Sequence, residues 1–317
     1  MSWFFYALIC TLAWGAADLF YKRGADDGDP FSHLRQAVWV GLIMGAGSTL
    51  LLLLSGGLHS GRELLRGALR YAPASLCYII SMVIGYAGLR YLELSIVSPV
   101  QNASGALSAL LMLIYFLGTG RIASVREEFS PRSLIGTGLI ALGVIALAVV
   151  EQRLSAAEAV SASDAAETKR FRLGAGALLF PLLYCLFDTL GTAADGILLD
   201  EESGLSLGET DILILYGLTF ALAGLIAWCW LWIREKRPYN PFAKSELPKA
   251  DAALCEEAGQ VFYVFAMARN PVLAAPMVAS YCIVSVLLSR LFLKEKLTKG
   301  QYLCIAAVIG GILLMGP

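Results

Sequence analysis

At residues 151–170 the chain reads EQRLSAAEAVSASDAAETKR, a polar stretch between two long apolar regions. Ser, Ala and Glu dominate this stretch, a composition typical of a linker rather than of a packed core. The stretch therefore predicts two units, residues 1–150 and residues 172–317, joined by a polar linker of residues 151–171.

The composition points to a membrane protein. Of the 317 residues, 58% are hydrophobic and only 15% are charged, whereas soluble domains carry about 25% charged residues. The net charge of -1 gives no sign of a nucleic-acid partner. We therefore expect the lipid bilayer as a partner and no nucleic acid.

Ten apolar runs have the length that a bilayer requires, which is about 20 residues for a helix. They are too long and lack the alternation of transmembrane strands. The sequence therefore predicts an all-α membrane protein with ten transmembrane helices, at residues 3–21, 34–55, 71–89, 94–118, 132–150, 172–194, 210–233, 249–268, 272–293 and 299–315.

The two halves resemble each other in sequence. A displacement of 170 aligns the first helix of each half, and a displacement of 177 aligns later segments: Trp14 with Tyr184, Asp18 with Asp188, Tyr86 with Tyr263 and Pro99 with Pro276. Because each half has five spans, the two copies would cross the membrane in opposite directions. Inverted repeats of this kind form alternating-access transporters with a central site between the repeats.

Two stretches resemble EamA-type members of the drug/metabolite transporter superfamily: TLAWGAADLFYKRGA at the start and SRLFLKEKLTKGQYLCIAAVIGGILL at the end. The resemblance implies ten helices around a central cavity lined mainly by helices 1, 3, 4, 6, 8 and 9, and an exporter in the cell (inner) membrane. Small multidrug-resistance relatives carry an essential glutamate in the first helix, where this chain has Trp14. Their proton chemistry is therefore not transferred to this chain.

The orientation of the chain in the membrane stays open. Seven Lys and Arg residues fall on the side of the N-terminus and seventeen on the opposite side. The positive-inside rule would thus place both termini outside, whereas the family resemblance implies that both are cytoplasmic. The acids of the loop between the sixth and seventh spans, among which we place Asp195, all lie on the side of the termini.

Four acids fall within predicted spans: Asp18, Asp188, Glu256 and Glu257. An acid at the centre of a bilayer helix costs about 2.5 kcal/mol or more, so it usually faces a cavity or a partner. All 24 Lys and Arg residues lie in loops or near helix ends. The predicted site is therefore acidic, and it suits a cationic or amine-bearing substrate or coupling to protons.

The case for a role in the cavity differs between the two aspartates. Asp18 precedes Lys22 by four residues, so an ion pair at the helix end competes with a role in the cavity. Asp188 has no such neighbour and shares a helix face with Tyr184, which favours the cavity. Trp14 and Asp18 form the matching stripe in the first half.

Helical spacing separates the two glutamates. Glu256, Gln260 and Tyr263 share one face of their helix, whereas Glu257 shares another face with Val261. Glu256 is therefore the better candidate for lining a pore, and Glu257 for packing against a neighbouring helix. The alternative is an interfacial helix start with both acids near the headgroups.

Further polar and aromatic residues complete the predicted pocket: Tyr78, Gln101, Asn102 and Tyr281. Tyr78 would offer an aromatic wall suited to a cation, or it would face lipid. Matched prolines, Pro99 and Pro276, would let two helices bend, although prolines are also tolerated in ordinary membrane helices.

We expect a secondary-active exporter of a small organic metabolite, amine-bearing or cationic, that works by alternating access and is coupled to protons. A sugar or nutrient importer of the same superfamily is the alternative. A polytopic membrane enzyme with buried carboxylates is the alternative of another class, but HExxH, GxSxG and Walker motifs are all missing from the sequence. With two histidines and no CxxC pair, we expect no cofactor and no metal; the oligomeric state stays open.

Overall fold

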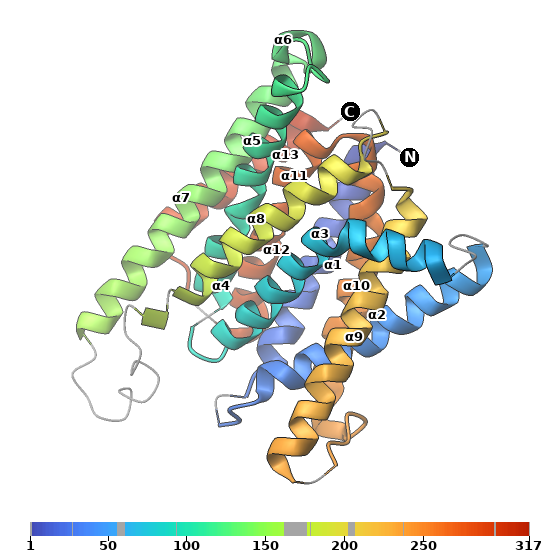
Figure 1. Cartoon of the computed structure of the whole chain (residues 1–317). Helices are drawn as coiled ribbons and strands as arrows, with labels where there is room; N and C mark the ends of the chain where they lie inside the picture. Colours follow the sequence, from blue (N-terminus) through green and yellow to red (C-terminus); the bar gives the residue numbers. More distant parts are fainter. Residues whose placement is uncertain are drawn as a thin grey trace.

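The computed structural model of the chain is all-helical, without strands among the residues that it describes. These residues are 2–26, 28–55, 61–92, 94–161, 176–177, 179–201, 207–236, 238–294 and 296–316. Figure 1 shows the helices as one bundle, with both chain termini at the same end. The expected all-α class is therefore confirmed.

The described residues form these α-helices: α1 (Trp3–Gly24), α2 (Ser32–Ser55), α3 (Gly61–Gly88), α4 (Leu94–Asn102), α5 (Ser104–Gly118), α6 (Val125–Glu128), α7 (Pro131–Ser161), α8 (Leu179–Leu199), α9 (Glu209–Glu235), α10 (Leu247–Arg269), α11 (Pro271–Ala279), α12 (Tyr281–Leu288) and α13 (Lys299–Met315). A π-helical turn, Ser289–Leu293, extends α12.

Eight helices among the described residues are long and apolar enough to cross a membrane, with α4–α5 and α11–α12 each counted as one. The eighth and tenth predicted spans also form helices, but α10 carries several charges and α13 has only 17 residues. The surface of the bundle exposes large apolar side chains such as Leu53, Trp232 and Leu303, as lipid contact requires.

Three boundaries differ from the prediction. Helix α3 begins at Gly61 rather than at residue 71, because its first turns are amphipathic and extend beyond the apolar window. Helix α7 continues to Ser161, into the expected linker, and residues 162–171 of that linker lie outside the described part of the chain. Helix α8 runs from Leu179 to Leu199 rather than over 172–194, so it contains Asp195, which we had placed in a loop.

Two spans are interrupted at matched positions. Ala103 separates α4 from α5, and Ser280 separates α11 from α12. Each break follows a proline by four residues, Pro99 in one half and Pro276 in the other. A proline within a helix removes the hydrogen bond to the residue four positions before it, and its ring crowds that turn. Each span therefore has a loosened turn before its proline as well as the break after it. The two breaks are separated by the same 177 residues as the two prolines.

Helices from the two halves pack against each other. The main pairs are α2 with α9, α1 with α10, α7 with α13, α3 with α8, and α5 with α11. The α2–α9 contact is close because Gly41 and Gly224 face each other. A Cβ atom added at Gly41 would lie 2.6 Å from the carbonyl oxygen of Phe220 and 2.8 Å from Cα of Gly224.

The variant Gly41→Ala should therefore lower the free energy of unfolding by about 1–3 kcal/mol, as overpacking of a tight contact does. The control is Gly310→Ala, because an added Cβ at Gly310 meets nothing within 4 Å. Thermal unfolding in detergent measures both variants. Equal melting temperatures of the two would contradict the close α2–α9 contact.

Charged side chains join helix ends opposite the termini. Arg35 of α2 pairs with Asp29 at 2.6 Å and with Glu235 at the end of α9, and its guanidinium lies 4.6 Å from the ring centroid of Tyr239. The hydroxyl of Tyr239 donates to Glu246 at 2.7 Å. Burial and this hydrogen bond raise the pKa of Tyr239. The network fixes the ends of α2, α9 and α10 relative to one another.

Candidate functional site

A central cavity of about 60 Å³ lies between the two halves, lined by α1, α3, α4, α5, α8, α9, α10, α11 and α12. It corresponds to the helices that the family resemblance implied, with Tyr216 of α9 in addition. Eleven of the twelve candidate residues line it: Trp14, Asp18, Tyr78, Gln101, Asn102, Tyr184, Asp188, Glu256, Gln260, Tyr263 and Tyr281.

Glu257 is the candidate that does not line the cavity. Its carboxylate lies against Gly47 of α2, so close that an added Cβ at Gly47 would overlap it. Glu256, one residue earlier, is buried and lies on the cavity wall. Helix α10 thus turns its two glutamates in different directions, as the 100° rotation per residue of an α-helix dictates.

Asp18 is held by two serines from opposite halves. Its Oδ2 accepts hydrogen bonds from Oγ of Ser98 on α4 at 2.6 Å and of Ser285 on α12 at 2.7 Å. The Nζ of Lys22 donates instead to the carbonyl oxygens of Leu89 and Leu92, at 2.6 and 2.8 Å. The helix-end ion pair between Asp18 and Lys22 is therefore not the arrangement observed.

Asp188 occupies the matching place in the second half. Its Oδ2 accepts a hydrogen bond from Oγ of Ser104 at 2.6 Å, at the start of α5. The broken helix α4–α5 therefore supplies a serine to each aspartate, Ser98 before the break and Ser104 after it. The two aspartates are positioned by the segments where the helix is interrupted.

Aromatic side chains form much of the cavity wall. The indole of Trp14 stacks on Tyr263 with ring centroids 5.2 Å apart, and its edge meets Tyr281 at 5.7 Å. Its Nε1 donates to the carbonyl oxygen of Glu256 at 3.2 Å, and its ring covers Gly259. Trp14 thus fixes α1 against α10 beside the cavity glutamate.

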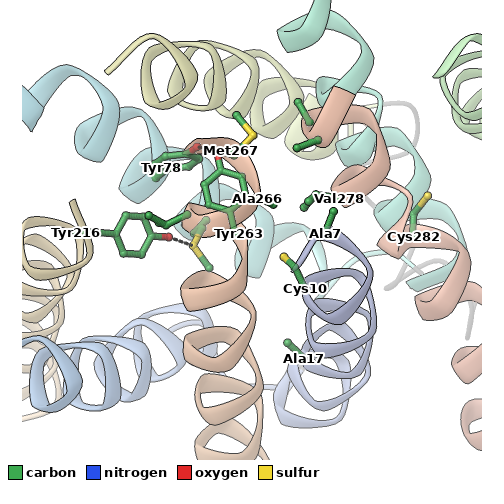
Figure 2. Packing of buried hydrophobic residues seen from close by; sticks show 14 of the residues in the cluster. Ala7, Cys10, Ala17, Tyr78, Tyr216, Tyr263, Ala266, Met267, Val278 and Cys282 are labelled. Carbon is green, nitrogen blue, oxygen red and sulfur yellow. Dashed lines mark hydrogen bonds between the residues drawn. The ribbon is translucent and has the colours of Figure 1, made fainter. Parts of the chain in front are cut away.

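Tyrosines from three helices meet next to this wall. The hydroxyls of Tyr78 and Tyr263 are 2.7 Å apart, and Tyr78 also donates to Oγ1 of Thr192 at 3.2 Å. Tyr216 meets Tyr78 edge to face, with centroids 5.7 Å apart. Figure 2 shows Tyr78, Tyr216 and Tyr263 gathered within the buried cluster. Tyr78 is therefore buried rather than lipid-facing.

Two amides on the cavity wall keep an unused donor. Within the described chain, Nε2 of Gln101 and Nε2 of Gln260 are buried and have no hydrogen-bond partner. Buried polar atoms are nearly always paired, so such atoms in a cavity wall mark groups available to a ligand.

Among the described residues, the cavity wall has side chains that can carry negative charge and none that can carry positive charge. Three carboxyl groups line the cavity, and among the described residues no Lys, Arg or His does so. A buried charge needs a compensating partner. The cavity therefore suits a positively charged ligand or bound protons. Within the described residues, no three His, Cys, Asp or Glu side chains are grouped as a metal site would require.

Several cavity residues escaped the sequence analysis. Tyr21 follows Trp14 and Asp18 at helical spacing, so extending that stripe by one position would have found it. Tyr216 gives no such signal, because it is a lone tyrosine in the apolar α9. Asp195, which lies outside the cavity, was misplaced because the apolar residues before Leu179 shifted the predicted helix toward the N-terminus.

Comparisons with known proteins agree with this fold. No curated protein sequence matches the chain. A solved structure, described only as the crystal structure of a protein, matches with a TM-score of 0.59 and 14% sequence identity, covering 98% of this chain and 95% of that chain; it shows the fold alone. Residues 203–316 match the model of the EamA-like transporter family, a family of the drug/metabolite transporter superfamily.

Proposed function

We propose that the protein is a secondary-active transporter of a small organic cation or amine, working in the cell membrane as an exporter that exchanges its substrate for protons. The family match supports a membrane transporter. The substrate class rests on the cavity. The direction of export rests on the resemblance to EamA-type exporters.

One observation supports a cationic substrate: the cavity wall combines three carboxyl groups with eight aromatic side chains. Among the residues that the structure describes, no Lys, Arg or His lines the cavity. Carboxylates offset the charge of a cation, and aromatic faces attract it through their quadrupoles, by about 0.5–2 kcal/mol for each contact. An anionic or zwitterionic substrate would leave its own carboxylate facing three others. A cation therefore fits this wall best.

The size of the cavity limits the substrate in this conformation. Its volume is about 60 Å³, whereas pockets for drug-sized ligands measure about 300–1,000 Å³. A small amine is thus the natural occupant, and a larger substrate requires the helices to move apart.

The helix contacts support alternating access between two inverted five-helix repeats, residues 1–150 and 172–317. With ten spans numbered in chain order, exchanging the halves converts the α1–α10 pair into the α3–α8 pair. It converts the α2–α9, α5–α11 and α7–α13 pairs into themselves. This is the pattern expected for a pseudo-two-fold axis through the cavity, where transporters of this design bind substrate.

Purified protein in liposomes tests the proposal with radiolabelled tetramethylammonium under an imposed pH gradient. This probe cannot lose a proton, so it crosses the bilayer slowly without a carrier. We expect accumulation at least tenfold above protein-free liposomes, driven by the proton gradient. Neopentyl alcohol, of similar shape but uncharged, should show no carrier-dependent flux.

Two outcomes would contradict the proposal. If the carrier-dependent flux of the neutral probe equalled that of the cation, the carboxyl groups would not select for positive charge. Covalent turnover of the probe would instead indicate a membrane enzyme.

A further inference from the structure

Asp195 is a second buried acid of α8 that does not line the central cavity. It lies seven residues after Asp188, about 10.5 Å further along the helix and close to its end at Leu199. Its side chain is fully buried, with 0% exposure. Asp195 is therefore separate from the carboxyl groups of the cavity, although it lies on the same face of α8 as Asp188.

The carboxyl group of Asp195 has unmet hydrogen-bonding capacity. Within the described chain, neither Oδ1 nor Oδ2 has a partner of normal geometry, and the buried hydroxyl of Tyr71 also lacks one. The titratable groups that face Asp195 come from four helices: Tyr71 and Tyr78 on α3, Tyr216 on α9, Tyr263 on α10 and Asp188 on α8. These neighbours are hydroxyls and an acid, and none of them is a base.

Two of these tyrosines separate Asp195 from the cavity. Tyr78 and Tyr263 line the cavity and hydrogen-bond each other at 2.7 Å. Tyr78 also donates to Thr192, one turn before Asp195 on α8. The tyrosine pair thus forms the wall between the cavity and the buried carboxyl; Figure 2 shows Tyr78 and Tyr263 side by side in this wall.

The chemistry of the carboxyl links it to this wall. An ionised carboxylate in a buried site requires hydrogen-bond donors, and the hydroxyls of Tyr71, Tyr78 and Tyr263 are the donors around it. Turning Tyr78 and Tyr263 toward Asp195 would break their mutual hydrogen bond. A protonated carboxyl leaves that bond intact, as it is in this structure.

We propose that Asp195 is a proton-binding site distinct from the cavity carboxyls, and that loss of its proton opens the Tyr78–Tyr263 contact. The ligand is a bare proton rather than a metal ion, because both carboxylate oxygens are closed off from solvent-sized space and Asp195 does not border the central cavity. The proton would be the one that is exchanged for substrate, so the coupling role rests on the proposed function.

The variant Asp195→Asn tests the coupling, because an amide keeps the shape and cannot release a proton. In liposomes it should retain tetramethylammonium exchange without a gradient within about threefold of the wild type. Accumulation driven by a pH gradient should fall at least tenfold. The control is Asp200→Asn, five residues later, whose carboxylate pairs with Arg121 at 3.3 Å; it should keep both activities. Unchanged gradient-driven accumulation in Asp195→Asn would overturn the proposal.

Infrared difference spectroscopy of the purified protein tests proton binding without any transport. The wild type should show a carboxylic acid C=O band that titrates with pH and is absent in Asp195→Asn. The variant Tyr71→Phe, which keeps the carboxyl, should shift the midpoint of that band. Absence of a band assignable to Asp195 would overturn the proposal, even if transport occurs. A titrating band in a protein that does not move tetramethylammonium would support the proton site and contradict the proposed substrate.

Discussion

Replacing Glu256 by glutamine is expected to weaken tetramethylammonium binding at least thirtyfold and to reduce its accumulation to a similar extent. Glu256 is buried on the cavity wall beside Trp14 and Tyr263. Removing one partner of a buried charge pair costs about 2–5 kcal/mol, and each 1.4 kcal/mol is about a tenfold change in affinity. Glutamine preserves the size of the side chain, so the loss reports on charge.

The adjacent residue provides the control. The variant Glu257→Gln makes the same chemical change one position along α10, where the carboxylate contacts Gly47 of α2 instead of the cavity. Binding should stay within about threefold of the wild type. Isothermal titration of both detergent-solubilised variants measures the difference directly, after gel filtration shows that each is monodisperse.

A Glu257→Gln variant as weak as Glu256→Gln would contradict the assignment of the cavity as the cation site. If both substitutions weakened binding equally, although only Glu256 lines the cavity, the acids of α10 would act through the general electrostatics or the folding of the helix. Normal binding in both variants would shift the site toward Asp18 and Asp188.

The sequence predicted the placement of these residues through helical spacing. The interval of four residues from Glu256 to Gln260 and of three to Tyr263 sets one helix face, and all three line the cavity. Glu257 falls on another face for the same reason. The match between Asp18 and Asp188 came from the internal repeat. Such features depend on the helix alone, so they are visible before the fold is known.

Other features depend on tertiary packing and gave no sequence signal. Tyr216 reaches the cavity because α9 packs beside α3, where its ring meets Tyr78. The serine partners of Asp18 come from residues 80 and 267 positions away, distances that no local pattern encodes. Asp195 was misplaced because the apolar residues before Leu179 look in sequence like the start of the helix.

The second large effect is expected from the matched prolines. The double variant Pro99→Ala, Pro276→Ala should slow tetramethylammonium transport at least tenfold while equilibrium binding changes less than threefold. Alanine restores the missing N–H and removes the ring that crowds the preceding turn, so the turn before each proline should become stiffer in α4 and in α11. A tenfold slower step corresponds to about 1.4 kcal/mol of added barrier.

The double variant should slow transport because the two interrupted helices hold the aspartates of both halves. Asp18 is bonded by Ser98 before the first break and Ser285 after the second, and Asp188 by Ser104 after the first. Any rocking of one half against the other must therefore bend these two helices or break the serine–aspartate bonds. Bending within these two segments, at the breaks and at the proline turns just before them, needs the least change in hydrogen bonding, and stiffer proline turns would resist it.

The control is Pro73→Ala, since Pro73 also lies within a helix, α3, but is exposed on the surface of the bundle. Its removal should leave the transport rate within about twofold of the wild type. Stopped-flow measurement of transport and equilibrium titration of binding separate rate from affinity. If the double variant lost binding and rate together, the prolines would shape the site rather than its movement, and alternating access would have to use another hinge, because the two breaks at Ala103 and Ser280 would then be static.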